Sequence, residues 1–454
     1  KPVVVMEAGK TESGAKAASS HTGSLAGSYE VYKAAFQQSG IIIAETVEEL
    51  FDFALVLSKN RKAGSIAIIT NSGGPGVMAS DAVEIHGLKL AKFASETIEA
   101  LKKFLPSSAS FYNPVDILGD ADTERFSKTI EIISKDNNVG TILAILAPTA
   151  QIAFNKAVEK VLSVEKPVFC CFMGIDESDE ETLIKNHIPN FFDPTRAVKA
   201  ISTIDRYSKF DFSEKEIKKF EVNKKEADII FEEFIKRESR FVGVEGMKLL
   251  ECYGINTAPW GIAKSADEAE KIAESIGYPV AMKIVSPDVI HKSDIGAIKL
   301  DVEKDKVRSS FYEIISRVED YLPEARIEGI LVQKMVKGGR EVILGMKKDP
   351  QFGEVIMFGL GGIYVEVFKD VAFRIAPVSF EDALDMIKSI KSFALLKGIR
   401  GEKMYDLNSL AETIVRFTQL SMDYPIAEME INPLKVFEKG CVAVDFRMLL
   451  EVKK

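Results

Sequence analysis

The sequence predicts an α/β protein whose N-terminal half is built of parallel α/β units, and three observations support this prediction. Apolar strands alternate with helical periods through the N-terminal half of the chain, which is typical of parallel α/β units. A glycine-rich turn follows one of these strands and precedes a helix. The C-terminal part carries an ordered set of lysine, carboxylate and amide side chains on expected strands. The length of 454 residues predicts about three domains.

Composition narrows the class of protein. A net charge of −9 argues against a general nucleic-acid-binding protein, which normally carries a basic patch. We find no apolar run of the length that a membrane helix needs and no signal peptide, so a cytoplasmic protein is expected. The four cysteines have neither metal-ligand nor disulfide spacing, which predicts buried thiols in a reducing compartment.

Residues 1–58 form the first predicted block. Its two strands are too few for a stable sheet, and the first strand is apolar enough to lie inside one. We therefore expect the chain to begin partway through a domain. In order, the block is predicted to contain a strand at Pro2–Met6, a glycine-rich loop, a helix at Tyr29–Gln38, a strand at Ile41–Ala44 and a helix at Val47–Leu57.

The loop of this block contains His21, which follows Ser20 and has small and hydroxyl side chains around it. The unperturbed pKa of histidine leaves much of the ring neutral at pH 7. An imidazole in such a loop can therefore act as a nucleophile toward phosphate. The alternative is a turn histidine that tolerates an unusual backbone conformation.

Residues 59–210 form the second block, whose alternating strands and helices predict a doubly wound, flavodoxin-like domain. Residues 211–238 follow as a charged, solvated linker with helical content. The expected strands of the second block are Ser65–Thr70, Thr141–Leu146 and Pro167–Phe172, with a shorter candidate at Leu88–Ala91 and a turn, Asn113–Asp116, at the end of another strand.

The glycine-rich turn after the first of these strands predicts an anion site. A helix is expected from Val77, and bare amides at a helix N-terminus together with the helix dipole favour phosphate. Tight turns also use glycine for steric reasons alone. The candidate phosphate-binding residues are Ser20, Asn71, Gly73, Gly74 and Gly76.

Residues 239–454 form the third block, which carries the residues expected to bind a nucleotide. Lys283 is predicted at the end of a buried strand, where an ammonium can meet phosphates; a lysine that only aids solubility is the alternative. The strand Ile330–Val336 runs into a polar turn, and such a hinge can offer backbone groups to an adenine and a carboxylate to a ribose. The nucleotide-binding candidates are Lys283, Gln333, Lys334, Val336 and Glu341.

Three polar residues near the C-terminus predict a magnesium site. Alternation places Glu430 and Asn432 on one face of a strand, and Asp445 is expected to end the next strand of a hairpin-like pair. Hard oxygens at close quarters suit Mg²⁺, which is usually held by one or two protein ligands together with nucleotide phosphates. Each residue alone is more often a surface residue, so the prediction depends on the ordered set.

The third block resembles the ATP-grasp fold, and the chain as a whole resembles the ADP-forming acyl-CoA synthetases. These enzymes are the acetate–CoA ligase branch of the succinyl-CoA synthetase superfamily. The resemblance implies flavodoxin-like domains of the succinyl-CoA synthetase type, followed by an ATP-grasp domain of two subdomains. The segments that support it are Ser19–Ser28, Ile69–Asp81, Asn113–Asp116, Lys283–Leu300 and Glu430–Leu434.

The resemblance implies roles for individual residues. His21 matches the histidine that takes the phosphoryl group of an acyl phosphate, and His291 matches a second phosphohistidine in the ATP-grasp part. Glu430 is similar to the carboxylate that orients the histidine ring when the histidine loop swings to the nucleotide site. Asn432 and Asp445 match the Mg²⁺ ligands. The implied cofactor is Mg²⁺, and the implied substrates are ATP or ADP, CoA, phosphate and a carboxylic acid.

Enzymes of this kind also use a CoA-binding domain and a glutamate that supports the first phosphohistidine. We expect both to be supplied outside this sequence, by a domain acting in cis or in trans, within an oligomer. Two other functions stay open. One is a regulatory module that senses nucleotide or acyl-CoA, and the other is a generic ATP-grasp ligase that needs no phosphohistidine.

Overall fold

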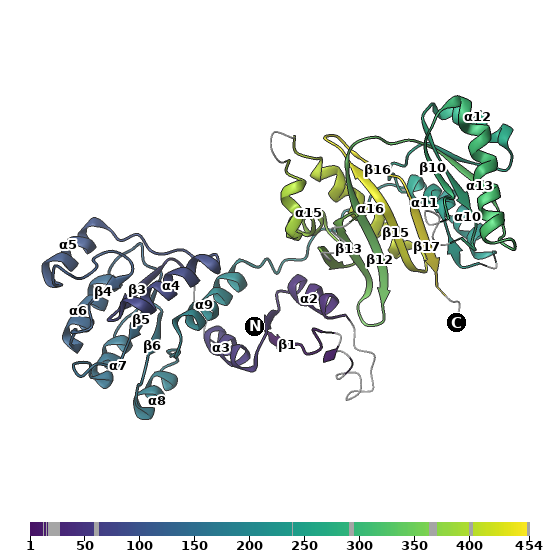
Figure 1. Ribbon diagram of the computed structural model, residues 1–454. Helices are drawn as coiled ribbons and strands as arrows, with labels where there is room; N and C mark the ends of the chain where they lie inside the picture. Colours follow the sequence, from purple (N-terminus) through teal and green to yellow (C-terminus); the bar gives the residue numbers. More distant parts are fainter. Residues whose placement is uncertain are drawn as a thin grey trace. The chain divides into compact units, whose positions relative to one another are not determined.

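The computed structural model describes residues 1–11, 13, 14, 16, 28–58, 63–237, 239–289, 295–362, 370–398 and 403–451. The chain divides into two compact units, which are described separately (Figure 1). Ser20, His21 and His291 lie outside the described residues. The first unit comprises Lys1–Ala26 and Phe36–Ser213, and the second comprises Gly27–Ala35 and Glu214–Lys454.

The first unit begins with a small parallel sheet of two strands, as the sequence predicts. β1 and β2 pair in register with Val4 opposite Ile42. Thr46 caps the following helix, because its side chain accepts a hydrogen bond from the amide of Glu49. The elements of this stretch are β1 (Val4–Met6), α2 (Tyr29–Gln38), β2 (Ile42–Ala44) and α3 (Val47–Leu57). Helix α2 is divided between the units, because its residues up to Ala35 belong to the second unit.

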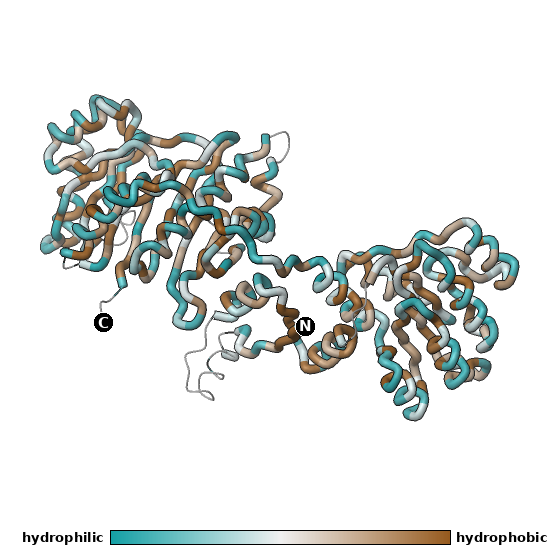
Figure 2. The backbone as a smooth tube through the Cα atoms, turned by 180° about the vertical axis from the view of Figure 1, so that it is seen from behind, coloured by the Kyte–Doolittle hydropathy of each residue, from teal (hydrophilic) through white to brown (hydrophobic). Residues whose placement is uncertain are grey.

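A second, four-stranded parallel sheet in the order β4-β3-β5-β6 forms the centre of this unit. β3, β5 and β6 are buried along their whole length, and their apolar character is plain in Figure 2. Helices cover both faces, which confirms the doubly wound fold (Figure 1). The strands are β3 (Ile66–Thr70), β4 (Val115–Asp116), β5 (Thr141–Leu146) and β6 (Val168–Phe172); the helices are α4 (Gly73–Ile85), α5 (Ser95–Phe104), α6 (Thr123–Ser134), α7 (Phe154–Leu162), α8 (Glu177–Lys185) and α9 (Pro194–Lys209).

Two details at the edge of β3 differ from the prediction. Leu88–Ala91 is not a strand, because only one bridge, between Ile66 and Leu90, is formed. The turn that contains Asn113 precedes β4 instead of ending a strand. The physical reason is that the Asn113 side chain takes up backbone groups along this edge. Its amide nitrogen donates to the carbonyls of Ile66 and Ala91 at 2.7 and 3.0 Å, and its oxygen accepts from Ile68 at 2.9 Å.

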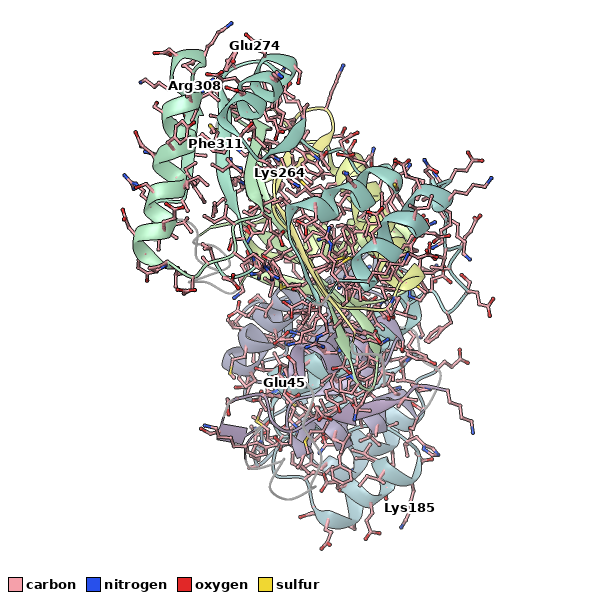
Figure 3. All side chains as sticks on the ribbon, turned by 90° about the vertical axis from the view of Figure 1, so that its right-hand side faces the viewer. Glu45, Lys185, Lys264, Glu274, Arg308 and Phe311 are labelled. Carbon is pink, nitrogen blue, oxygen red and sulfur yellow. The ribbon has the colours of Figure 1, made fainter. Side chains whose placement is uncertain are left out.

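The second unit contains an antiparallel sheet in the order β10-β9-β11-β8. Helices α12 and α13 pack on it through one apolar cluster. Figure 3 labels two residues of α13: Phe311 is buried in this cluster, whereas Arg308 is exposed and bonds to Glu270 on α12 at 2.8 Å. The elements are β8 (Trp260–Ala263), α12 (Ala266–Ile276), β9 (Val280–Val285), β10 (Ile298–Val302), α13 (Val307–Tyr321) and β11 (Gly329–Lys334).

A larger antiparallel sheet in the order β14-β13-β12-β15-β17-β7 completes this unit, with β16 paired to β15. Helix α16 is buried along one face and contributes to the core of the unit. The elements are α10 (Lys224–Ile235), β7 (Phe241–Val242), α11 (Met247–Cys252), β12 (Arg340–Asp349), β13 (Gly353–Leu360), β14 (Val371–Ile375), α15 (Phe380–Ser389), α16 (Leu407–Asp423), β15 (Ile426–Val436), β16 (Cys441–Ala443) and β17 (Phe446–Leu450).

The expected linker is only partly solvated. Its helix, α10, buries Ala227, Phe231 and Phe234 in the core of the second unit. These positions recur at helical spacing, so one face of α10 is apolar. The ring of Phe231 stacks on Tyr424 with a centroid distance of 4.4 Å. The second half of residues 211–238 is therefore part of the folded second unit.

The four cysteines are buried and form no disulfide with one another, as predicted. Burial raises the pKa of both Cys171 and Cys441 to about 12, so these thiols stay protonated and unreactive at neutral pH. Among the described residues, no helix combines the length and the apolar character that crossing a membrane requires.

Candidate nucleotide and phosphate sites

Lys283 and Asp445 form an ion pair at the centre of the second unit. Lys283 lies in the middle of β9, not at its end as predicted, and is only 8% exposed. Its Nζ donates to Oδ2 of Asp445 at 3.2 Å. Asp445 lies between β16 and β17 instead of ending a strand. The two residues that the sequence assigned to phosphate and to Mg²⁺ are thus brought together.

Gln333, on β11, is fully buried beside this pair. Its Nε2 donates to the carbonyl of Val444 at 2.9 Å, and its Oε1 has no partner in the described part of the chain. A buried carbonyl oxygen without a partner is costly, so this atom is ready to accept from a ligand. The bond from Nε2 to Val444 also holds the backbone next to Asp445 in place.

The predicted hinge is tied to its surroundings by hydrogen bonds. The backbone amide of Lys334 donates to the carbonyl of Pro259 at 2.8 Å, so this one backbone group of the hinge is already hydrogen-bonded. Lys435 on β15 connects the other two candidates. Its Nζ donates to the carbonyl of Val336 at 3.0 Å and lies 3.3 Å from Oε1 of Glu341. Lys435 was not predicted, because only the pairing of β12 with β15 brings it opposite Glu341.

Glu430 and Asn432 share one face of β15, as alternation predicts. Nδ2 of Asn432 donates to Oε1 of Glu430 at 2.9 Å, and Nε of Arg447 donates to Oε2 at 2.9 Å. Arg447 lies directly opposite Glu430 in the β15–β17 register. Arg447 was not predicted, since the register of two strands decides which side chains meet.

The donor set of Asn432 and Asp445 fits Mg²⁺. Because Nδ2 of Asn432 is bound to Glu430, its Oδ1 is left as an acceptor. The amide of Asn432 also donates to the carbonyl of Asp445 at 3.2 Å, which holds the two residues side by side. No group of three or more histidine, cysteine or acidic side chains suited to a metal occurs among the described residues. Two oxygen ligands completed by phosphates and water are the usual arrangement for Mg²⁺.

The glycine-rich turn of the first unit differs from the expected cradle in two ways. The Asn71 side chain is 2% exposed and bonds both to the carbonyl and to the amide of Ala147, at 2.9 and 2.8 Å, so it joins two strand ends and is not free for phosphate. The helix begins at Gly73, before the predicted Val77, because Pro75 needs no N–H partner in a first turn. The exposed residues Gly73 and Gly74 thus form the helix N-terminus.

We expect Gly76→Ala to lower the free energy of unfolding of the first unit by about 1–3 kcal/mol, the usual cost of overpacking. A Cβ at Gly76 would lie 2.9 Å from Cγ2 of Thr70, on the strand under α4. Gly74 is the matched control, since a Cβ there meets nothing within 4 Å. Gly74→Ala should leave stability unchanged or raise it by up to about 1 kcal/mol. Urea denaturation of the two variants tests this, and equal losses would contradict it.

A cavity of about 1090 Å³ lies elsewhere in the second unit, at the Val285–Gly329 end of β9 and β11. Lys264, which Figure 3 labels, and Phe311 line it. None of the predicted nucleotide residues is among its lining residues. The polar residues described above, and not this cavity, therefore define the candidate nucleotide site.

The fold and these residues define a class of protein: an α/β protein that joins a CoA-ligase type of domain to a nucleotide-binding ATP-grasp domain. Three family models match the chain. They are a succinyl-CoA ligase like flavodoxin domain over residues 1–57, a Ligase-CoA domain over 66–206 and an ATP-grasp domain over 235–450.

The relatives define the family. An ADP-forming acetate–CoA ligase I of Archaeoglobus fulgidus is 58% identical over 99% of this chain, and the chain spans 66% of that protein. The β subunit of an ADP-forming acetate–CoA ligase I of Pyrococcus furiosus is 46% identical over 47% of this chain and 94% of the subunit. The chain belongs to the family of ADP-forming acetate–CoA ligases. This membership confirms the predicted resemblance and fold class.

A solved structure is also similar to part of the chain. It is described as the dinucleotide forming acetyl-coenzyme A synthetase 1 of Ca. Korarchaeum cryptofilum, in complex with coenzyme A, Ca-AMPCP and HgCl+. The match has 39% identity and a TM-score of 0.49, and it covers 50% of this chain and all of that chain.

Proposed function

We propose that this protein is an ADP-forming acid–CoA ligase, in which acid, CoA and ATP are in equilibrium with acyl-CoA, ADP and phosphate. The observation that carries the proposal is the meeting of Lys283, Gln333 and Asp445 at one place in the second unit. The ammonium of Lys283 can hold phosphates, and the carboxylate of Asp445 can hold a divalent cation. The amide oxygen of Gln333, which has no partner among the described residues, can accept from a hydrogen-bond donor of the ligand.

The phosphoryl group moves in steps through two histidines in this proposal. Its P–O bond to the β-phosphate of ATP breaks as a P–N bond to His291 forms, and ADP is released. The group then passes to His21 and on to the acid, which gives an acyl phosphate; the CoA thiol finally displaces phosphate. Relay residues are needed because chemistry cannot act between distant sites.

The chain's own residues bind and orient the reactants in these steps. Lys283 neutralises the nucleotide phosphates, and Asn432 and Asp445 hold Mg²⁺, which supplies further charge neutralisation when bound. Glu430 orients the histidine ring when its loop swings to the nucleotide site. In the first unit, the amides of Gly73 and Gly74 at the start of α4 stabilise phosphate on His21.

We also propose that a CoA-binding domain docks on the first unit. Val3 and Met6 of the two-stranded sheet are 49% and 41% exposed, which is unusual for apolar side chains at a strand. A cavity of about 980 Å³ beside them has apolar walls that include Val4, Leu57 and Phe212. Some relatives divide this activity between α and β subunits, which supports a partner in trans.

Labelling with γ-³²P-ATP and Mg²⁺ tests the function. We expect acid-labile, base-stable label on the wild-type chain and none on His291→Asn. His21→Asn should still be labelled, because His291 accepts first from ATP, but it should not form acyl-CoA when a CoA-binding domain is supplied. Binding of nucleotide without any label would overturn the ligase and favour the sensing module. Label that survives His291→Asn would contradict the proposed order of the relay.

A further inference from the structure

Lys283 and Asp445 each neutralise the other, although the proposed function assigns them to different ligands. The Lys283 side chain is 9% exposed and that of Asp445 is 31% exposed. Asp445 is the single acceptor recorded for the Lys283 ammonium among the described residues. An ammonium buried to this extent is strongly destabilised when its counter-ion is removed without replacement.

The carboxylate of Asp445 divides its two oxygens between two partners. Oδ1 accepts from the amide of Phe446 at 2.9 Å, whereas Oδ2 faces Lys283. Oδ2 is thus the atom that has to change partner when a cation binds. Lys283 likewise has to change partner when a phosphate arrives.

The surrounding hydrogen bonds keep the backbone in place when this pair opens. Gln333 donates to the carbonyl of Val444, and the amide of Asn432 donates to the carbonyl of Asp445. Neither bond involves the charged atoms of the pair. The exchange of partners therefore needs only side-chain movement.

We propose that the Lys283–Asp445 pair couples the binding of Mg²⁺ to the binding of nucleotide within the protein. Phosphate replaces Asp445 as the partner of Lys283, and Mg²⁺ replaces Lys283 as the partner of Asp445. Either ligand alone leaves one charge unpaired, so each ligand raises the affinity for the other by the same factor. The inference rests on the proposed nucleotide site and concerns its regulation.

Two single variants separate the halves of this exchange. Asp445→Asn frees Lys283, so ADP in the presence of EDTA should bind more tightly than to the wild type, by about 5-fold or more, within the usual range of coupling. Lys283→Met frees Asp445, so Mn²⁺ without nucleotide should bind more tightly by a similar factor. Calorimetry measures the first affinity, and paramagnetic resonance of free Mn²⁺ measures the second.

Two control variants distinguish the loss of the Lys283–Asp445 ion pair from a change in the overall charge of the protein. Lys348→Met removes a cation and Glu451→Gln removes an anion, and these two side chains pair with each other at 2.5 Å, apart from the residues of the proposed site. We expect the first control to leave the affinity for Mn²⁺ alone unchanged. The second should leave the affinity for metal-free ADP unchanged.

Different results would contradict the coupling between Mg²⁺ and nucleotide and the proposed nucleotide site itself. A wild-type chain that binds no ADP even with Mg²⁺ would contradict the nucleotide site itself. A wild type that binds ADP with Mg²⁺, combined with no gain of affinity in either variant, would overturn the coupling alone. A gain equal to that of the controls would also overturn it. Circular dichroism checks folding, and Asp445→Ala and Lys283→Gln replace a variant that does not fold.

Discussion

Glu430→Gln is expected to slow phosphoryl transfer between nucleotide and protein by on the order of 10²-fold, because a carboxylate that orients a reacting histidine has effects of this size. A neutral amide accepts a weaker hydrogen bond from Arg447 and from an imidazole N–H. The affinity for ADP with Mg²⁺ should change little. Glu430 accepts a hydrogen bond from Nδ2 of Asn432, so the Oδ1 atom of Asn432 is left free. ADP–ATP exchange measures the first quantity and calorimetry the second.

Arg447→Met is the matched control for this prediction. It keeps the carboxylate and removes only the group that holds Oε2 of Glu430. The rate of ADP–ATP exchange should therefore fall less in Arg447→Met than in Glu430→Gln. If both variants lost affinity for ADP with Mg²⁺ in proportion to their loss of exchange, Glu430 would belong to the nucleotide site and not to the transfer step.

Arg196→Leu is expected to destabilise the first unit by about 3 kcal/mol, because it leaves a buried carboxylate without its partner. Asp52 on α3 is 6% exposed, and Nη2 of Arg196 on α9 donates to its Oδ1 at 2.8 Å. The hydrogen bond to Asp52 also raises the pKa of Arg196. The figure is at the lower end of the usual range because the Arg196 side chain is 31% exposed. Calorimetry should show a melting temperature lower by about 6–12 °C.

The double variant Asp52→Leu/Arg196→Leu tests the cause of this loss. Removing both charges leaves no unpaired ion, so much of the stability should return. A double variant that is as unstable as Arg196→Leu would show that packing of the arginine stem, and not the unpaired carboxylate, explains the loss. Both substituted positions lie on helices that cover one face of the parallel sheet.

Local pattern was sufficient to predict most elements of this fold. The helices at Tyr29–Gln38 and Val47–Leu57 have the predicted ends. The linker was correctly predicted to have helical content, but α10 is not solvated all round, because its apolar residues recur at helical spacing and are buried on one face. High charge density hid this face, since the composition of a segment does not say which side of a helix is covered.

The candidate site was predicted less completely than the fold. Asn71 and Gly76 have the residue types of a phosphate loop, yet Asn71 bonds to Ala147 and Gly76 allows α4 to approach Thr70. Lys435 and Arg447 were missed because each acts through a partner on a neighbouring strand. Residue type indicates which chemistry is possible, whereas the neighbours decide whether the group is free to perform it.

The sequence by itself determined the order of strands and helices, the family and the residue types of a nucleotide and phosphate site, because apolar periodicity and short motifs are local. Only the tertiary structure decided that Lys283 pairs with Asp445, Gln333 with Val444 and Asn71 with Ala147. These partners are 162, 111 and 76 positions apart in the chain. Buried polar groups must find hydrogen bonds, and at such separations the packing of strands selects the partner.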